Sequence, residues 1–125
     1  MKKISLEPLK KALQSLKNAI AQTKNEYIRD SVIQRFEYTF ELSWKIIKKV
    51  LEQDQPLEDA SVKGILRSAA TYGIISNLEL WFEFQHARNL TSHTYNEDSA
   101  EEVYEVAVKL PPEIDLLLLK LSVRN

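Results

Sequence analysis

Apolar residues recur at steps of three and four along almost the whole of this chain, and chain breakers are rare. The 125 residues include only two glycines and four prolines. Because this spacing places side chains on one face of an α-helix, while glycine and proline interrupt helices, the pattern favours a few long amphipathic helices. The chain is also too short for two ordinary domains. We therefore predict an all-α fold in which residues 1–125 form a single helical domain.

The first half of the chain predicts two helices. One begins near residue 6, with Ser5 available as its cap, and ends near Asn25. The other covers about residues 27–52 and has room for an i, i+4 ion pair between Glu41 and Lys45. We expect its aromatic stripe to pack in the core or in a subunit interface. The stripe consists of Phe36, Phe40 and Trp44.

Turn and capping signals divide the next part of the chain. A short helix over residues 61–72 should end at Gly73, which suits the position after a helix C-terminus. Gly64, inside this segment, weakens the helical signal. The sequence Ser76-Asn-Leu-Glu79 has the form of a capping box, so a further helix should open there and run toward Arg88.

The last helical region follows a second capping box, Ser99-Ala-Glu-Glu102. Its apolar residues stay in helical phase through Pro111-Pro112, which predicts a kinked or restarted helix within the same domain. Together the segments predict an up-and-down four-helix bundle with additional short helices.

Composition excludes several classes of protein. The chain has no cysteine, which rules out disulfide scaffolds, thiolate metal sites and cysteine nucleophiles, and fits a cytoplasmic setting. The longest apolar run, residues 116–119, is far too short to span a membrane, so we expect no membrane span, no signal peptide and no membrane partner. The net charge of −1 argues against a protein that coats nucleic acid with a broad basic surface.

Charge is nevertheless unevenly distributed. Residues 1–50 are mostly basic among their charged positions, whereas residues 97–125 are mostly acidic. Antiparallel helices with complementary faces would explain this asymmetry. A basic side for a phosphate-bearing substrate and an acidic side for a partner would explain it equally.

Chemically reactive side chains concentrate between Arg88 and Tyr95. The segment reads Arg-Asn-Leu-Thr-Ser-His-Thr-Tyr and combines a guanidinium, one of the two imidazoles of the chain and a phenol. On a regular helix, Arg88 and His93 would lie roughly 140° apart around the axis and about 7.5 Å apart along it. Their cooperation therefore requires the helix to unwind after Arg88, or a two-fold dimer to supply both groups. Thr91 and Ser92 favour a helix that ends here.

This combination suits metal-free cleavage of RNA. A neutral imidazole can take the proton of a ribose 2′-hydroxyl, an imidazolium can protonate the leaving oxygen, and a guanidinium can stabilise the charged phosphate. Asn89 could orient the scissile group, or it could cap local backbone. Because an exposed helix end often carries the same residue types, their spacing alone does not choose between these interpretations.

Two stretches resemble one known superfamily. Arg88-Asn89-x-x-x-His93-x-Tyr95 is similar to the Arg-x4-His-x-Tyr motif of HEPN-domain proteins. The stretch from Arg35 to Lys45, RFEYTFELSWK, resembles the second helix of one HEPN branch. That branch comprises the nucleotidyltransferase substrate-binding proteins, HepT-like toxin partners of minimal nucleotidyltransferases. The resemblance covers nearly the whole chain in length and helix order.

This resemblance implies a HEPN-like bundle that forms a homodimer, with Arg88 and His93 of each protomer in a composite cleft. It implies a cytoplasmic ribonuclease toxin that acts on tRNA or another RNA without a metal or cofactor. It also implies a cognate minimal nucleotidyltransferase, encoded nearby, that neutralises the toxin by transferring AMP to Tyr95. A phosphate-bearing group beside His93 would occupy the position of the substrate phosphate and repel RNA.

Two other functional classes stay open. In the first, the chain is a non-catalytic subunit of the nucleotidyltransferase, in which Arg88 and His93 only bind a nucleotide or other substrate. In the second, Glu83-x-x-His86 belongs to a metal site, because carboxylate-bridged di-iron bundles use this spacing. Such sites need two copies of the motif, so a dimer would have to supply the second.

Glu37 and Glu41 are candidates for a supporting role. Either carboxylate could face Arg88 or His93 and fix its orientation. Alternatively, both make solvent-exposed pairs with neighbouring lysine or arginine side chains.

Overall fold

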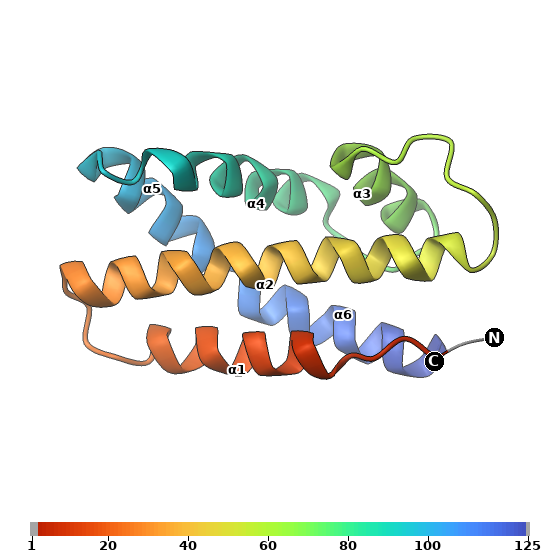
Figure 1. Ribbon diagram of the computed structural model, residues 1–125, viewed down its shortest axis with the longest axis horizontal. Coiled ribbons are helices and arrows are strands. Elements are labelled where there is room, and N and C mark those ends of the chain that lie inside the picture. The colour runs from red at the N-terminus through yellow and green to blue at the C-terminus, as the bar shows by residue number, and fades with distance from the viewer. Residues whose placement is uncertain (1–2, 125) are drawn as a thin grey trace.

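A computed structural model describes residues 3–124, and these residues form helices without a single strand (Figure 1). The all-α prediction is confirmed. A short 3₁₀ helix, η1 (Thr91–His93), follows the fourth α-helix. The α-helices are α1 (Glu7–Ile20), α2 (Glu26–Glu52), α3 (Val62–Thr71), α4 (Leu78–Leu90), α5 (Glu97–Ala107) and α6 (Leu110–Arg124).

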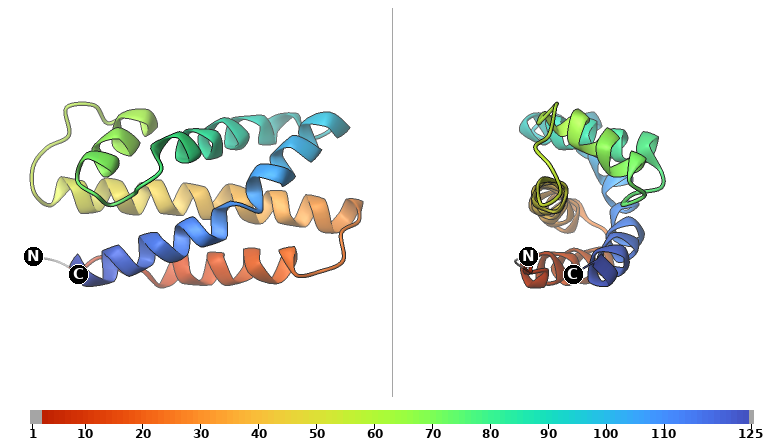
Figure 2. Two further views of the ribbon diagram at one scale, coloured as in Figure 1. Left: turned by 180° about the vertical axis from the view of Figure 1, so that it is seen from behind. Right: turned by 90° about the vertical axis from the view of Figure 1, so that its right-hand side faces the viewer.

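The longest helix, α2, runs the length of the molecule, and the other helices pack around it as three further rods (Figures 1 and 2). α1 lies along one side of α2, and α3 and α4 follow one another along the opposite side. α5 and α6 return together across the remaining face (Figure 2). Because successive rods run in opposite directions, the molecule is the predicted up-and-down bundle, with the third and fourth rods each made of two helices.

Aromatic side chains join α2 to α4 in the centre of the core. Phe36 and Phe40 are buried and stack with ring centroids 6.3 Å apart. Phe40 contacts Trp81, and Trp81 meets Phe84 edge to face at 5.4 Å. The expected aromatic stripe is therefore core for two of its members, while Trp44 lies half-buried at its edge. This packing fixes α4 against the middle of α2.

Asparagine side chains cap three of the helices, α2, α4 and α5, and in the last two they take the place of a predicted serine. α1 ends at Ile20, so Asn25 caps α2 instead of ending α1, and its Oδ1 accepts a hydrogen bond from Ile28 N at 2.8 Å. Ser5 is not the cap of α1, because the residue directly before that helix is Leu6, which makes no side-chain cap.

Both predicted capping boxes are wrong in register. Asn77 caps α4 in place of Ser76, and Asn96 caps α5 in place of Ser99. Asparagine is at least as good a cap as serine, and each side chain reaches the free N–H groups of the first turn. The serine-to-glutamate spacing therefore indicated roughly where each helix begins, but a nearby asparagine is the residue that caps it.

The end of α3 and the restart at α6 match the predictions. Gly73 has φ +74°, and Ile74 N donates to Ala69 O at 2.8 Å, which gives a helix stop that favours glycine. Gly64 fits inside α3 because a Cβ there would collide with Asp59. α5 ends at Ala107, and α6 begins at Leu110 with both prolines in its first turn, where no N–H is needed.

Candidate functional site

Arg88 lies in the last turn of α4 and is held by a carboxylate from α2. Its Nε donates a hydrogen bond to Glu41 Oε1 at 2.6 Å, and both side chains are about one third exposed or less. Among the described residues, the two Nη atoms of Arg88 have no hydrogen-bond partner. The guanidinium is therefore oriented through one nitrogen while its other donors face solvent and can meet an anion.

Glu41 pairs with Arg88 of α4 and not with Lys45, the neighbour expected on its own helix. The structure contains no Glu41–Lys45 ion pair within the described residues, and Arg88, which is distant in sequence, takes the carboxylate instead. Of the two predicted supporting residues, only Glu41 contacts the motif. Glu37 is half-buried and makes no hydrogen bond or ion pair with any described residue.

The helix ends at Leu90, two residues after Arg88, as the polar residues Thr91 and Ser92 predicted. Hydroxyl groups compete for the terminal carbonyls: Thr91 Oγ1 donates to Arg88 O at 2.7 Å, and Ser92 Oγ donates to Asn89 O at 3.2 Å. The α-helix gives way to the tighter 3₁₀ helix η1. The chain then turns again, where Asn96 N donates a hydrogen bond to the carbonyl of His93. Local side-chain bonds of this kind replace the α-helical ladder.

His93 and Tyr95 emerge side by side from this turn. Their rings are 6.1 Å apart and nearly perpendicular, and both side chains are exposed, Tyr95 to 86%. No hydrogen bond, ion pair or ring contact joins Arg88 to His93 within the described residues. The side chain of Asn89 is likewise exposed and contacts neither of them. One chain therefore brings together Arg88 with Glu41 and His93 with Tyr95, as two separate pairs.

Arg29 is a buried arginine that the sequence analysis did not identify. It holds α5, the helix that follows the Arg88–Tyr95 segment. Arg29, at the start of α2, is 5% exposed and donates to Glu97 at 2.6 Å and to Glu101 at 3.2 Å. These contacts fix the first turns of α5, just beyond Tyr95. The available signal was a charge in an apolar seam, since Arg29 precedes Ile33 and Phe36 by four and seven residues on one face of α2.

Electrostatics at this anchor follow from those contacts. The hydrogen bond to Glu97 raises the pKa of Arg29 further above its ordinary value, although burial opposes this shift. In return, the hydrogen bond from Arg29 lowers the pKa of Glu97. The pKa of Glu101 is lowered by its hydrogen bonds with Lys24 and then Arg29. Arg29, Glu97 and Glu101 are therefore charged at neutral pH.

The Glu83-x-x-His86 pair does not build a metal site within this chain. Glu83 is 3.6 Å from Lys109, and His86 Nε2 is 3.6 Å from Glu102 Oε2 across a shallow groove between α4 and α5. No group of three or more metal-ligating side chains gathers anywhere in the described residues. Glu83 and His86 therefore take part in surface contacts at the α5 side of α4.

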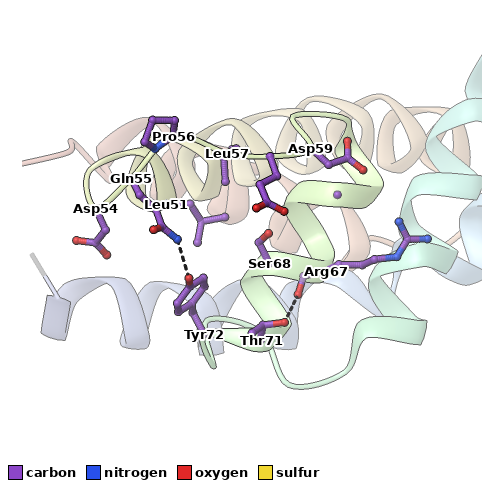
Figure 3. A pocket seen from close by; sticks show the side chains of 12 residues that line it. Leu51, Asp54, Gln55, Pro56, Leu57, Asp59, Arg67, Ser68, Thr71 and Tyr72 are labelled. Atoms are coloured by element: carbon purple, nitrogen blue, oxygen red, sulfur yellow. Dashed lines mark hydrogen bonds between the residues drawn. The ribbon is translucent and has the colours of Figure 1, made fainter.

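A hollow of about 440 Å³ lies at the other end of the molecule, between the end of α2, the loop that follows it and α3 (Figure 3). Gln55 Nε2 donates to the hydroxyl of Tyr72 across its mouth at 2.9 Å. Arg67 points away toward α4, where its guanidinium lies over the ring of Phe82. None of the predicted site residues lines this hollow, so it is separate from the Arg88 segment.

None of the helices in the described part of the chain has the length and apolar character that a membrane span requires.

Comparison with known proteins gives a consistent assignment. The family described as nucleotidyltransferase substrate binding protein like matches residues 4–123. A Haemophilus influenzae protein named probable ribonuclease HepT is 32% identical over 139 aligned positions, which cover 98% of this chain and 95% of that protein.

Solved structures agree with this match. A Haemophilus influenzae structure, described as the fold of a substrate-binding domain of a nucleotidyltransferase, is 30% identical with a TM-score of 0.85, covering 94% of this chain and 99% of that one. A crystal structure of a Thermus thermophilus protein is 35% identical with a TM-score of 0.82, covering 90% of this chain and 98% of that one. By the extent of the sequence match and the shared helical fold, this chain belongs to the nucleotidyltransferase substrate-binding protein family.

Proposed function

We propose that this chain is a metal-independent ribonuclease toxin of a two-component pair, which cleaves tRNA or another RNA in the cytoplasm. The observation that carries the proposal is the break after α4. There Glu41 orients Arg88, whose Nη donors have no partner among residues 3–124, and His93 emerges exposed one turn later. The relative named probable ribonuclease HepT supports the same activity.

The chemistry requires only the protein and the RNA. A neutral His93 removes the proton from a ribose 2′-hydroxyl, whose oxygen then attacks the adjacent phosphorus. The bond from phosphorus to the 5′-oxygen breaks, and an imidazolium donates the proton that this oxygen needs. The products are a 2′,3′-cyclic phosphate and a 5′-hydroxyl. Arg88 stabilises the negative charge that develops on the phosphate in the transition state.

A homodimer would complete this site. Cleavage needs an acid and a base, and each chain has a single histidine in the segment. Among the described residues, this histidine has no hydrogen bond, ion pair or ring contact with its own Arg88. Two copies related by a two-fold axis would supply two imidazoles and two guanidinium groups to one cleft. Asn89, exposed beside Arg88, would then be able to contact the bound RNA.

Control of the toxin would act through Tyr95. Its side chain is highly exposed, and its ring lies 6.1 Å from that of His93. The proposed partner, a minimal nucleotidyltransferase encoded nearby, transfers AMP from ATP to the tyrosine oxygen and releases pyrophosphate. The added phosphate places negative charge beside His93 and repels RNA.

Cleavage is tested by incubating the purified protein with tRNA in EDTA. We expect fragments ending in cyclic phosphate, and their loss in His93→Ala and Arg88→Ala. His86→Ala is the matched control, because it removes the other histidine from an exposed position on α4. Intact tRNA at high enzyme excess, or equal cleavage by all three variants, would contradict the proposal.

Modification is tested by co-expression with the neighbouring nucleotidyltransferase and intact-mass measurement. We expect the mass of one adenylyl group to be added to the wild-type chain and to Tyr27→Phe, but not to Tyr95→Phe. Tyr27 is a suitable control because it is also highly exposed, at 81%. Addition to Tyr95→Phe would place the modification elsewhere.

The second candidate is a non-catalytic subunit that presents a nucleotide or other substrate to the transferase. The described role of the Haemophilus influenzae structure favours it. In that case, Arg88→Ala would weaken nucleotide binding, measured by calorimetry, while no preparation of the protein would cleave RNA.

A further inference from the structure

Three lysines in the C-terminal half of α2 have no role in the proposed chemistry. Lys45 and Lys49 are exposed and Lys48 is half-exposed. None of the three has an ion pair or hydrogen bond with any described residue. By contrast, Lys17 and Lys24 each form an ion pair with a carboxylate. Unpaired positive charge is therefore concentrated on this half of the helix.

The contact between Glu41 and Arg88 explains why the charge of Lys45 is not neutralised on its own helix. Glu41 is placed at i−4 from Lys45, where a pair would stabilise the helix, but its carboxylate is engaged by Arg88. Lysines three and four positions apart also repel one another. The helix dipole compensates for Lys49 in the last turn, but its effect does not extend to Lys45.

The lysines lead away from Arg88 along one face of α2. Positions 41, 45 and 48 fall within about 60° around the helix axis, and residue 48 lies about 10 Å beyond residue 41 along it. Lys49 borders the same face. Lys45 Nζ lies 5.8 Å from the ring centroid of Trp44, so its aliphatic stem can rest on the indole while its charge stays exposed.

We infer that Lys45, Lys48 and Lys49 form a phosphate track that binds the backbone of single-stranded RNA next to the phosphate held by Arg88. This inference rests on the proposed function, because the lysines would bind the part of the RNA that extends beyond the phosphate at Arg88. Lysine binds phosphate as a point charge without reading sequence. A local track also explains how a chain of net charge −1 would hold RNA without a broad basic surface.

The test compares two triple variants with the same loss of charge. Lys45→Gln with Lys48→Gln and Lys49→Gln removes the track. The control replaces lysines of α1, which lies across α2 from α4 (Figure 1). It combines Lys10→Gln, Lys11→Gln and Lys17→Gln.

Fluorescence anisotropy of a labelled single-stranded oligonucleotide gives the affinity at salt concentrations between about 50 and 200 mM. The DNA form of the probe lacks the 2′-hydroxyl and cannot be cleaved by the proposed mechanism, so His93 stays intact. The RNA form is measured in the His93→Ala background.

For both probes, we expect the track variant to reduce the slope of log affinity against log salt by about 2, because each lost phosphate contact on a single strand removes about 0.7. The control should keep the wild-type slope. Lys→Arg at the three track positions should restore it, which excludes misfolding as the cause. Equal slopes for the track variant and the control would overturn the inference.

The inference and the proposed function fail separately. If wild-type protein never cleaves tRNA but the track variant still has a smaller slope of log affinity against log salt, the lysines bind RNA as part of a non-catalytic binding protein. If wild-type protein cleaves tRNA and the track variant binds and cleaves with unchanged KM, the lysines are a solvated face and only the ribonuclease remains.

Discussion

The carboxylate of Glu41 fixes the orientation of Arg88 at the end of α4. Because Nε of Arg88 is bonded to Glu41, the side chain loses conformational freedom before substrate arrives. Its two Nη groups are therefore held in a fixed orientation. In the proposed ribonuclease, Glu41 is thus a positioning residue that acts through Arg88. Its location on α2, the central helix, gives that orientation a rigid support.

Replacing Glu41 tests this positioning role. Glu41→Ala should lower kcat for RNA cleavage by about 10²-fold, because a misplaced phosphate-binding group loses transition-state stabilisation. KM should change much less, and the midpoint of thermal unfolding should stay nearly constant, because the pair is partly exposed. Glu37→Ala removes a carboxylate that has no ion-pair partner among the described residues, and it should cleave like wild type. Equal kcat in both variants would remove Glu41 from the site.

Arg29 provides a second prediction at the residue scale, which concerns pH. The pKa values of Glu97 and Glu101 are lowered in the folded protein, so both bind protons more weakly than in the unfolded chain. Their contribution to the free energy of unfolding is therefore complete above about pH 4.3, the ordinary glutamate pKa, and is lost as the pH falls below it.

Thermal unfolding between neutral pH and pH 3 measures this effect. Arg29→Met should lower the unfolding midpoint by several degrees at neutral pH and should unfold with a weaker acid dependence than wild type. Lys10→Met, which removes an exposed i, i+3 pair on α1, is the control and should follow the wild-type curve. Parallel curves for Arg29→Met and wild type would contradict the role of the anchor.

At the scale of elements, helix ends position the functional groups. α4 ends after Arg88, η1 carries His93 outward, and the Asn96 cap starts α5 directly after Tyr95. Asn96 Oδ1 accepts from the N–H groups of Asp98 at 2.9 Å and Ser99 at 3.3 Å. The segment is therefore fixed at both ends by local hydrogen bonds as well as by the core.

Two matched cap variants separate stability from activity. Asn96→Ala and Asn77→Ala should each cost about 0.5–2 kcal/mol of stability, because each removes one asparagine cap. Only Asn96→Ala should also reduce cleavage at a temperature where both proteins are fully folded, since it borders the His93 turn. Chemical denaturation and RNA cleavage assays give the two quantities. A similar loss of cleavage in Asn77→Ala would show a general effect of stability instead.

The whole molecule is a rigid support with its reactive segment at one end. α2 spans the bundle, its aromatic contacts fix α4, and the Arg29 anchor fixes α5, so the connection between α4 and α5 is held from both sides (Figure 1). Among the described residues, no hydrogen bond, ion pair or ring contact joins the Arg88–Glu41 pair to the His93–Tyr95 pair. This lack of a direct interaction is the reason that we propose a composite site in a homodimer.

Complementation tests the composite site. Arg88→Ala and His93→Ala, each inactive alone, should regain part of the wild-type cleavage when they are unfolded together and refolded as mixed dimers. A mixed dimer has one intact Arg88 and one intact His93 in the same cleft. Because the second imidazole is missing, water has to supply the other proton transfer, and only part of the activity should return. Sedimentation of the mixture verifies that dimers form. Mixed dimers with no cleavage would show that each site uses Arg88 and His93 of the same chain.

Local signals were sufficient for much of this protein. The spacing of apolar residues predicted the helices, the glycine at position 73 predicted the end of α3, and the prolines at 111 and 112 predicted the restart before α6. The serine and threonine run predicted the end of α4. Each of these depends on residues within a few positions of one another, so the sequence alone contains the cause.

Contacts between distant residues were decided only by the tertiary structure. Glu41 has Lys45 within reach on its own helix, yet packing of α4 against α2 brings Arg88 to it and leaves the lysine unpaired. Arg29 likewise finds Glu97 only because α5 returns to the start of α2. Helix periodicity places each side chain on a face, but it does not say which faces meet. The relative position of the helices, set by how their apolar side chains interlock, decides which charges become partners.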